Sequence, residues 1–140
     1  MHISTKTGYA VKALTDLALH ASSAPVSLPE ICERQKLPLK YTEQLFRKLR
    51  IHGLVRGIHG SRGGYILPRP PASITLQDII AAVEDDIGYK FCYLKSENDK
   101  YCRNYPCRYS RLWNDIRKKL EKFFSTVNLE QIITEHQENL

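Results

Sequence analysis

The chain of 140 residues has no long hydrophobic run. No stretch reaches the roughly 18 uninterrupted apolar residues that a membrane-spanning helix requires. The N-terminal region also lacks the pattern of a signal peptide, because Lys12, Asp16 and His20 interrupt its only apolar stretch. These absences predict a cytoplasmic protein with no membrane partner.

The sequence also lacks the motifs of common enzymes. It contains no phosphate-binding loop, no HExxH zinc motif, no serine–histidine–aspartate order and no pair of carboxylates placed for acid–base catalysis. The adjacent Asp85 and Asp86 are interpreted as the loop at a helix end. There is no internal repeat, and the length suits one domain with an appended arm. We therefore predict that the protein is not an enzyme.

Positive charge is in excess, and it lies in one half of the chain. The net charge is +6, and residues 1–70 carry +7, with 11 Lys and Arg against four Asp and Glu. The remaining residues together carry −1. This asymmetry indicates a polyanionic partner for the first half, although a solvated basic surface would give the same charge count.

Apolar periodicity and capping residues predict six helices and one hairpin. The helices are expected at about 4–21, 27–35, 40–52, 75–84, 108–126 and 128–138. Two short β-prone runs, 54–59 and 65–67, flank a glycine-rich turn at 60–64. Two short helices joined by a tight turn and followed by a hairpin form a winged helix-turn-helix.

The predicted fold class is therefore mainly α with a small β-hairpin wing. Residues 1–84 are expected to form the winged helix-turn-helix DNA-binding domain, and 85–107 a cysteine-bearing cofactor loop. Residues 108–140 are expected to form a long dimerisation helix and a C-terminal helix. That long helix carries Trp113, Phe123 and Phe124. Together these aromatic side chains present more apolar surface than a small domain easily covers. This favours self-association, because a second copy of the chain could cover that surface.

The second helix of a helix-turn-helix enters the major groove of DNA. The candidate contacts on it are Lys40, Tyr41, Thr42, Glu43, Gln44, Arg47 and Lys48. Gln44 can bind adenine with two hydrogen bonds, and Glu43 can accept from cytosine N4, whereas Tyr41 is also a candidate core residue. The wing would place His59, Ser61 and Arg62 on the DNA backbone or in the minor groove. A compact helical core for protein docking is the alternative.

Three cysteines, Cys92, Cys102 and Cys107, lie in one irregular segment, with nine and four residues between them. Structural disulfides are rare in the cytosol, and a zinc site would lack a fourth ligand because no histidine lies between residues 60 and 135. Three thiolates near many lysines and arginines suit an iron–sulfur cluster, or equally a thiol redox switch. Cys32 is interpreted as a small buried hydrophobe.

Several segments resemble winged-helix transcription regulators of the Rrf2 type. They are STKTGYAVKALTDLALH, ICERQKLPLKYTEQLFRKLRIHGLVRGIHGSRGGYIL, SITLQDIIAAVE and, after the spaced cysteines, LWNDIRKKLEKFFSTVNLEQI. The family includes IscR-like, NsrR-like and CymR-like branches. The resemblance implies a homodimer built by crossing long helices and a palindromic operator in double-stranded DNA. For the cluster-bearing branch it implies an iron–sulfur cluster held by Cys92, Cys102 and Cys107.

The resemblance also implies roles for single residues. Lys40, Glu43 and Gln44 become base contacts, with Glu43 at a position linked to sequence discrimination. His59 stands where IscR-like members have an arginine, and Arg62 is the candidate substitute.

The cluster ligands depart from the family pattern. Ser110 replaces a histidine that completes the IscR-like site, and Thr7 and Gly8 occupy the stretch that supplies an acidic ligand in NsrR-like relatives. The fourth ligand stays open between Ser110, His2, solvent and a small thiol, and the cluster type between 2Fe-2S and 4Fe-4S.

The predicted function is a regulator that senses redox, nitric oxide or iron–sulfur status. The alternative is a cofactor-free member of the family controlled by thiol oxidation or by a protein partner.

Overall fold

The computed structural model describes residues 3–84 and 108–136, and most of them are helical. The elements are α1 (Thr5–His20), α2 (Leu28–Gln35), α3 (Leu39–Ile51), β1 (Arg56–Ile58), β2 (Gly64–Ile66), the 3-10 helix η1 (Pro71–Ser73), α4 (Leu76–Val83), α5 (Ser110–Phe124) and α6 (Leu129–His136). Strands β1 and β2 pair antiparallel. The predicted fold class and element order are confirmed, with ends that differ by one or two residues.

Local sequence explains where several helices begin. At α2, the Ser27 hydroxyl accepts from the Glu30 amide, and the Glu30 carboxylate accepts from the Ser27 amide at 3.0 Å. The same reciprocal exchange joins Thr75 with Asp78 and Asn128 with Gln131. Such caps satisfy amides that have no partner inside the helix, and each contributes about 1 kcal/mol.

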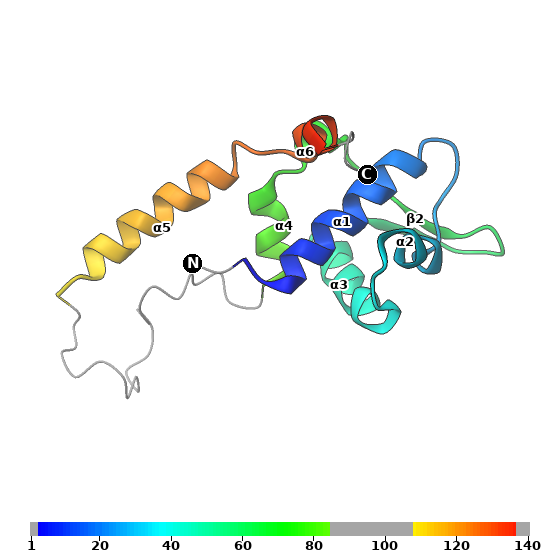
Figure 1. The fold of residues 1–140 in the computed structure, drawn as a ribbon, viewed down its shortest axis with the longest axis horizontal. Helices are drawn as coiled ribbons and strands as arrows, with labels where there is room; N and C mark the ends of the chain where they lie inside the picture. The colour runs from blue at the N-terminus through cyan, green and yellow to red at the C-terminus, as the bar shows by residue number, and fades with distance from the viewer. Residues whose placement is uncertain (1–2, 85–107, 137–140) are drawn as a thin grey trace.

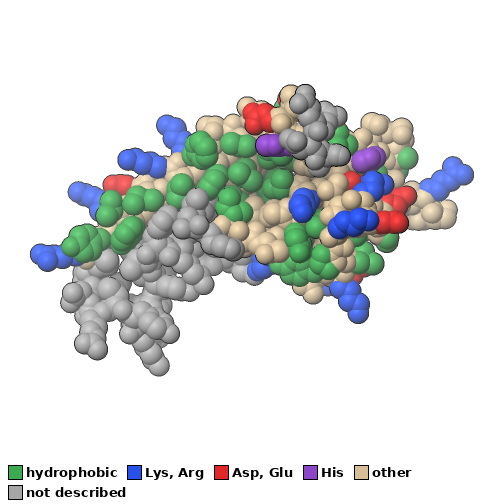
Figure 2. All heavy atoms as spheres, viewed as in Figure 1, with side chains coloured by type: hydrophobic (Ala, Val, Ile, Leu, Met, Phe, Trp, Pro, Cys, Tyr) green, Lys and Arg blue, Asp and Glu red, His purple; other side chains and the backbone are tan. Residues whose placement is uncertain are grey.

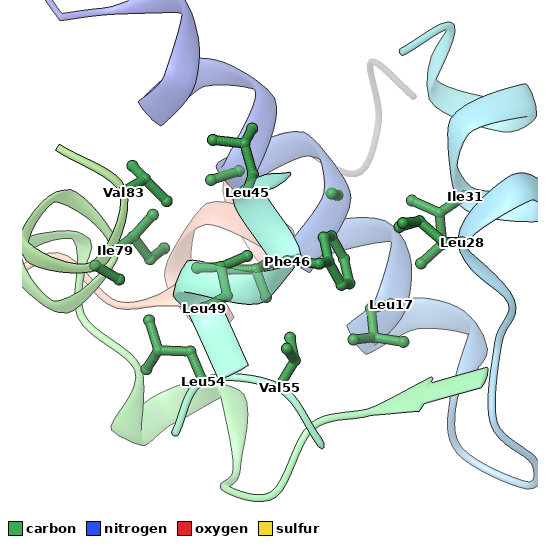
Figure 3. Close-up of a cluster of buried hydrophobic side chains, with 14 of the residues drawn as sticks. Leu17, Leu28, Ile31, Leu45, Phe46, Leu49, Leu54, Val55, Ile79 and Val83 are labelled. Carbon is green, nitrogen blue, oxygen red and sulfur yellow. The ribbon is translucent and has the colours of Figure 1, made fainter. Parts of the chain in front are cut away.

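The hydrophobic core is built around α3. Figure 3 shows Leu45, Phe46 and Leu49 of α3 in the middle of the cluster, facing side chains from the surrounding elements. These partners are Leu17 of α1, Leu28 and Ile31 of α2, Leu54 and Val55 after α3, and Ile79 and Val83 of α4. Because the core fixes one face of α3 in this way, the other face is held rigidly toward solvent.

The wing is attached to the loop between α1 and α2. Tyr65 of β2 exchanges two backbone hydrogen bonds with Val26, of 2.8 and 3.0 Å, and its ring lies 4.8 Å from that of Phe46. Gly64 is required here, because a Cβ would lie 2.5 Å from the Val26 backbone. These contacts fix the orientation of the hairpin relative to α3.

The two C-terminal helices differ in their packing. α6 lies on the winged domain, where Leu129 joins the core and its amide donates to the Ile74 carbonyl at 2.8 Å. α5 extends away from α1–α3 (Figure 1). α6 thus packs with the winged domain, against α1 and η1. Within the described ranges, no helix is both long enough and apolar enough to span a bilayer.

Candidate nucleic-acid interface

The outer face of α3 is polar and basic. Lys40, Glu43, Gln44 and Arg47, four of the seven residues predicted on this helix, are exposed and follow each other at helical spacing. Arg50 continues the same face toward the C-terminus. Pro38, at the N-cap, provides no side-chain hydrogen bond to the first turn. The face therefore offers three cations, one carboxylate and one amide on a rigid support.

The other three predicted α3 residues lie elsewhere. Thr42 is 0% exposed, and its hydroxyl donates to the Pro38 carbonyl at 2.8 Å, which corrects the prediction that its side chain faces DNA. Tyr41 is half-buried against the core, with its ring 5.8 Å from that of Tyr9, as the alternative placement anticipated. Lys48 is also half-buried, and its Nζ lies 3.5 Å from the Val83 carbonyl at the end of α4.

The tip of the wing exposes all three predicted residues, His59, Ser61 and Arg62. The turn depends on glycine. Gly60 has a φ of 117° and accepts a hydrogen bond from the Gly63 amide at 3.0 Å. A Cβ at Gly63 would lie 2.2 Å from the Ile58 carbonyl oxygen. The tight turn thus leaves the three polar side chains as the outermost groups of the hairpin.

An ion pair between a buried carboxylate and a partly exposed guanidinium joins α1 to α2. Asp16 is 1% exposed and accepts from Arg34 Nη2 at 2.7 Å and from Gln35 Nε2 at 3.0 Å. Burial raises the pKa of Asp16, but the hydrogen bonds from Arg34 and Gln35 and the Arg34 charge outweigh it and hold that pKa below its usual value. Because α3 packs on both helices, this pair helps to set the direction of its exposed face.

Two further arginines, Arg50 near the end of α3 and Arg56 at the start of β1, were not predicted as DNA contacts. Arg50, Arg56 and His59 line a solvent-open hollow of about 560 Å³ between the end of α3 and β1. Helical spacing could have indicated Arg50, which follows Arg47 by three residues on the same face. Arg56 could not be assigned from the sequence, because its position depends on how the hairpin packs.

The predicted cluster ligands are mostly beyond what the structure describes. Cys92, Cys102, Cys107 and His2 lie outside the described residues, and Ser110 is the first residue of α5. Cys32 is a free thiol buried in the core, as predicted. In the part of the chain that is described, no three His, Cys, Asp or Glu residues are grouped to hold a metal ion.

The residue before the cysteine segment is held in place. The Glu84 carboxylate accepts hydrogen bonds from the hydroxyls of Ser4 and Thr7, the second at 2.8 Å. Thr7 itself is buried. The end of α4 is therefore joined to the first turn of α1.

A helix-turn-helix with an attached glycine-cornered hairpin defines a winged-helix protein of the kind found in transcription regulators. The chain belongs to the Rrf2 family, whose model, described as an iron-dependent transcriptional regulator, matches residues 3–135. This confirms the predicted family and the prediction that the protein is not an enzyme.

Relatives and solved structures agree with this assignment. A helix-turn-helix transcriptional regulator of Haemophilus influenzae is 42% identical over 134 residues, which cover 95% of this chain and 87% of that protein. The structure of T. potens IscR is similar with a TM-score of 0.73 and 34% identity, covering 99% of this chain and 90% of that one. CymR, the global cysteine regulator of B. subtilis, also gives a TM-score of 0.73, with 32% identity and coverage of 96% and 98%.

Proposed function

We propose that this protein is a homodimeric transcription regulator that binds a palindromic site in duplex DNA. The observation that carries the proposal is the outer face of α3, which exposes Lys40, Glu43, Gln44 and Arg47 beside a basic wing. In a winged helix this face enters the major groove, and the donor and acceptor groups near its start reach base edges. Membership of a family of transcription regulators supports the same function.

The contacts divide into two kinds. Gln44 and Glu43 read bases, because an amide can bind adenine with two hydrogen bonds and a carboxylate can accept from cytosine N4. Lys40 joins them as a base contact by resemblance to the family. Arg47 and Arg62 bind phosphates, which orients the protein on the duplex without selecting a sequence. His59 and Ser61 lie beside Arg62 at the wing tip and contact the backbone or the minor groove.

Self-association takes place through α5. Leu112 and Phe123 are 48% and 61% exposed, and Trp113, Ile116 and Leu120 are only half-buried. We call these five residues the α5 stripe. Figure 2 shows hydrophobic side chains along this helix between Lys and Arg side chains. A second copy that covers the stripe removes this apolar surface from water, at about 25 cal/mol per Å². A twofold dimer also provides the two recognition helices that a palindrome needs.

Cys92, Cys102 and Cys107 hold an iron–sulfur cluster in this proposal. The donor set fits, because cysteine thiolates are the usual ligands of such clusters and nearby cations favour the thiolate form. The cluster would supply sensitivity to redox state, nitric oxide or iron–sulfur supply. The candidate types are 2Fe-2S and 4Fe-4S, and the candidates for the fourth ligand are Ser110, His2, solvent and a small thiol.

The second candidate is a cofactor-free regulator controlled by thiol oxidation or by a protein partner. The observation that favours it is the fold similarity to CymR, which equals the similarity to IscR by TM-score. Both candidates share the DNA-binding surface and differ only in what the cysteine segment does.

The DNA-binding proposal is tested with a site selected by the full-length protein from random duplexes. Gln44→Ala should weaken binding to the selected site by about 1–3 kcal/mol and leave binding to unrelated duplexes unchanged. Arg62→Ala should weaken binding to every sequence and lower the salt dependence by about one phosphate contact. Equal losses on all sequences for Gln44→Ala would show that it reads no base. A wild-type protein that selects no site and ignores duplex DNA at low salt would overturn the proposal.

The cofactor proposal is tested by purification without oxygen. The wild type should be coloured and contain both iron and acid-labile sulfide, and the variant with Cys92, Cys102 and Cys107 replaced by alanine should contain neither. Cys32→Ala is the matched control and should retain the colour, because Cys32 lies in the core. A colourless wild type that lacks iron and sulfide but forms a disulfide on oxidation would select the cofactor-free candidate.

A further inference from the structure

The hollow between α3 and the wing has a mostly apolar wall that also carries two arginines and a histidine. The residues that line it include Arg50, Arg56, His59 and Gly57, which lies in the middle of β1. Apolar residues such as Ile58 and Pro68 complete the wall. Sites for small molecules enclose most of the ligand surface, whereas this hollow is broad and open to solvent. An extended polyanion that passes across the surface fits it better than an enclosed metabolite.

The hairpin directs a backbone amide to the outer edge of the ribbon. Gly57 lies opposite Tyr65 in the ladder, and Tyr65 uses both of its backbone groups to bond Val26 on its other side. In an antiparallel ladder, opposite residues exchange either both hydrogen bonds or neither. Gly57 and Tyr65 therefore form a pair that exchanges neither, and the Gly57 amide points to the edge of β1 that faces away from β2.

The fold does not require glycine at position 57. Its φ lies outside the left-handed region, and a Cβ there would meet only the Tyr65 ring, at an ordinary 3.8 Å. Glycine in a strand interior weakens the strand, and it often marks a place where a ligand comes close to the backbone. Gly63 and Gly64 differ in this respect, since a Cβ at either would collide with backbone atoms.

The hollow is continuous with the proposed DNA surface. Arg50 follows Arg47 on the outer face of α3, and His59 begins the wing tip. A duplex that contacts both Arg47 and the wing tip must therefore pass over the hollow. We propose that the hollow seats a phosphodiester of the duplex backbone, bound by the guanidinium groups of Arg50 and Arg56 and by the Gly57 amide. This inference rests on the proposed DNA-binding function and adds a contact between its two proposed parts, the outer face of α3 and the wing tip.

The first test measures binding of the full-length protein to a fluorescent mixed-sequence duplex of about 30 base pairs, roughly three helical turns. Arg50→Ala and Arg56→Ala should each lower the slope of log affinity against log salt by about one per DNA-contacting protomer. The control Arg111→Ala removes the same charge from α5, which lies at the opposite end of the molecule from β2 (Figure 1), and should leave the slope unchanged. If wild type binds but all three variants match it, the hollow does not contact DNA. If wild type does not bind, the proposed function itself fails.

The second test concerns the close approach at Gly57. Gly57→Ala keeps every charge but adds a methyl group beside the Tyr65 ring, on the face of the hairpin that forms part of the wall of the hollow, so it should weaken duplex binding severalfold without lowering the melting temperature. Gly8→Ala is the matched control, because a Cβ there has no neighbour within 4 Å and lies in α1. Equal affinity of Gly57→Ala and wild type would remove the Gly57 amide from the proposal.

The last arm distinguishes DNA from any other phosphate. In an amide NMR spectrum, the Gly57 resonance should shift on addition of the duplex and stay in place with inorganic phosphate at the same ionic strength. Equal shifts with both would mean a general anion site and would overturn the assignment to the DNA backbone. No shift with the duplex would overturn the contact.

Discussion

The winged domain and α5 are both amphipathic, yet among the described residues only the winged domain covers its own apolar face. In the winged domain, the inner face of α3 is completed by α1, α2 and α4, and Phe46 is 0% exposed. On α5, Phe123 is 61% exposed although it belongs to an equally regular stripe. An amphipathic pattern thus predicts that a face will be buried but does not identify what buries it. We propose that the covering surface for α5 is the second copy of the chain.

The strongest test of this comparison sets one phenylalanine against the other. Phe46→Ala should lower the free energy of unfolding by about 3–5 kcal/mol at every protein concentration, because it leaves a cavity inside one chain. Phe123→Ala should cost much less, and its cost should fall as the protein is diluted and the dimer dissociates. Urea unfolding at several concentrations measures both. A large, concentration-independent cost for Phe123→Ala would mean that its own chain covers it.

The dimer itself is tested on the α5 stripe. Leu112→Glu places a charge in the proposed interface and should reduce the mass in sedimentation equilibrium from that of two chains to that of one. Lys118→Glu is the control on the opposite side of the same helix, where the side chain is exposed. Lys118→Glu should leave the dimer intact, although it changes the net charge of the chain more than Leu112→Glu does. A dimeric Leu112→Glu protein would place the interface elsewhere.

The third prediction compares a buried with an exposed ion pair inside the winged domain. Asp16→Asn should cost about 1–2 kcal/mol at neutral pH, less than a fully buried pair because Arg34 is partly exposed. Arg69→Gln, which breaks the exposed pair with Asp78, should cost under about 1 kcal/mol.

The pKa of Asp16 gives this prediction its pH dependence. Since that pKa is lowered in the folded state, its contribution is complete above the unfolded value of about 3.9 and is lost as the pH falls through the folded value. The difference in unfolding free energy between wild type and Asp16→Asn should therefore persist from neutral pH to about pH 4 and shrink below it. A difference that grows on acidification would contradict the assignment.

The smallest predicted effect is on stability, and it has opposite signs for alanine substitutions at two glycines. Gly8 is exposed inside α1 with open space around it, so Gly8→Ala should stabilise the protein by about 0.5–1 kcal/mol. Gly64→Ala should destabilise it, since the new Cβ would meet the Val26 backbone. Thermal melts of the two variants measure both signs. A destabilised Gly8→Ala protein would show that the first turns of α1 have a neighbour outside the described residues.

Features determined by neighbouring residues were predicted well. The caps at Ser27, Thr75 and Asn128 depend on side chains only three positions away, and the glycine turn of the wing depends on its own backbone. The position of α3, the proposed recognition helix, followed from the same local signals. Four of the seven residues predicted on this helix are exposed, whereas the side chain of Thr42 points into the core and those of Tyr41 and Lys48 are half-buried.

Features determined by distant contacts were missed. Leu129 of α6 packs on the winged domain because the backbone around Asn128 bonds that around Thr75, which no local pattern reveals. Arg56 reaches the hollow only because Tyr65 pairs with Val26 and orients the hairpin. Residue type and spacing predicted Cys92, Cys102 and Cys107 as cluster ligands. All three lie outside the described residues, so this stays a prediction.

The attachment of α6 to the winged domain has a consequence for operator choice. Only residues 125–128 separate the end of α5 from α6, whose first residue, Leu129, is fixed in the core. In the proposed dimer, this short connection would set the distance and rotation between the two recognition helices. One inserted residue there would change the preferred spacing of half-sites while every base contact and the α5 stripe stayed intact. Operator length would thus be encoded far from any residue that touches a base.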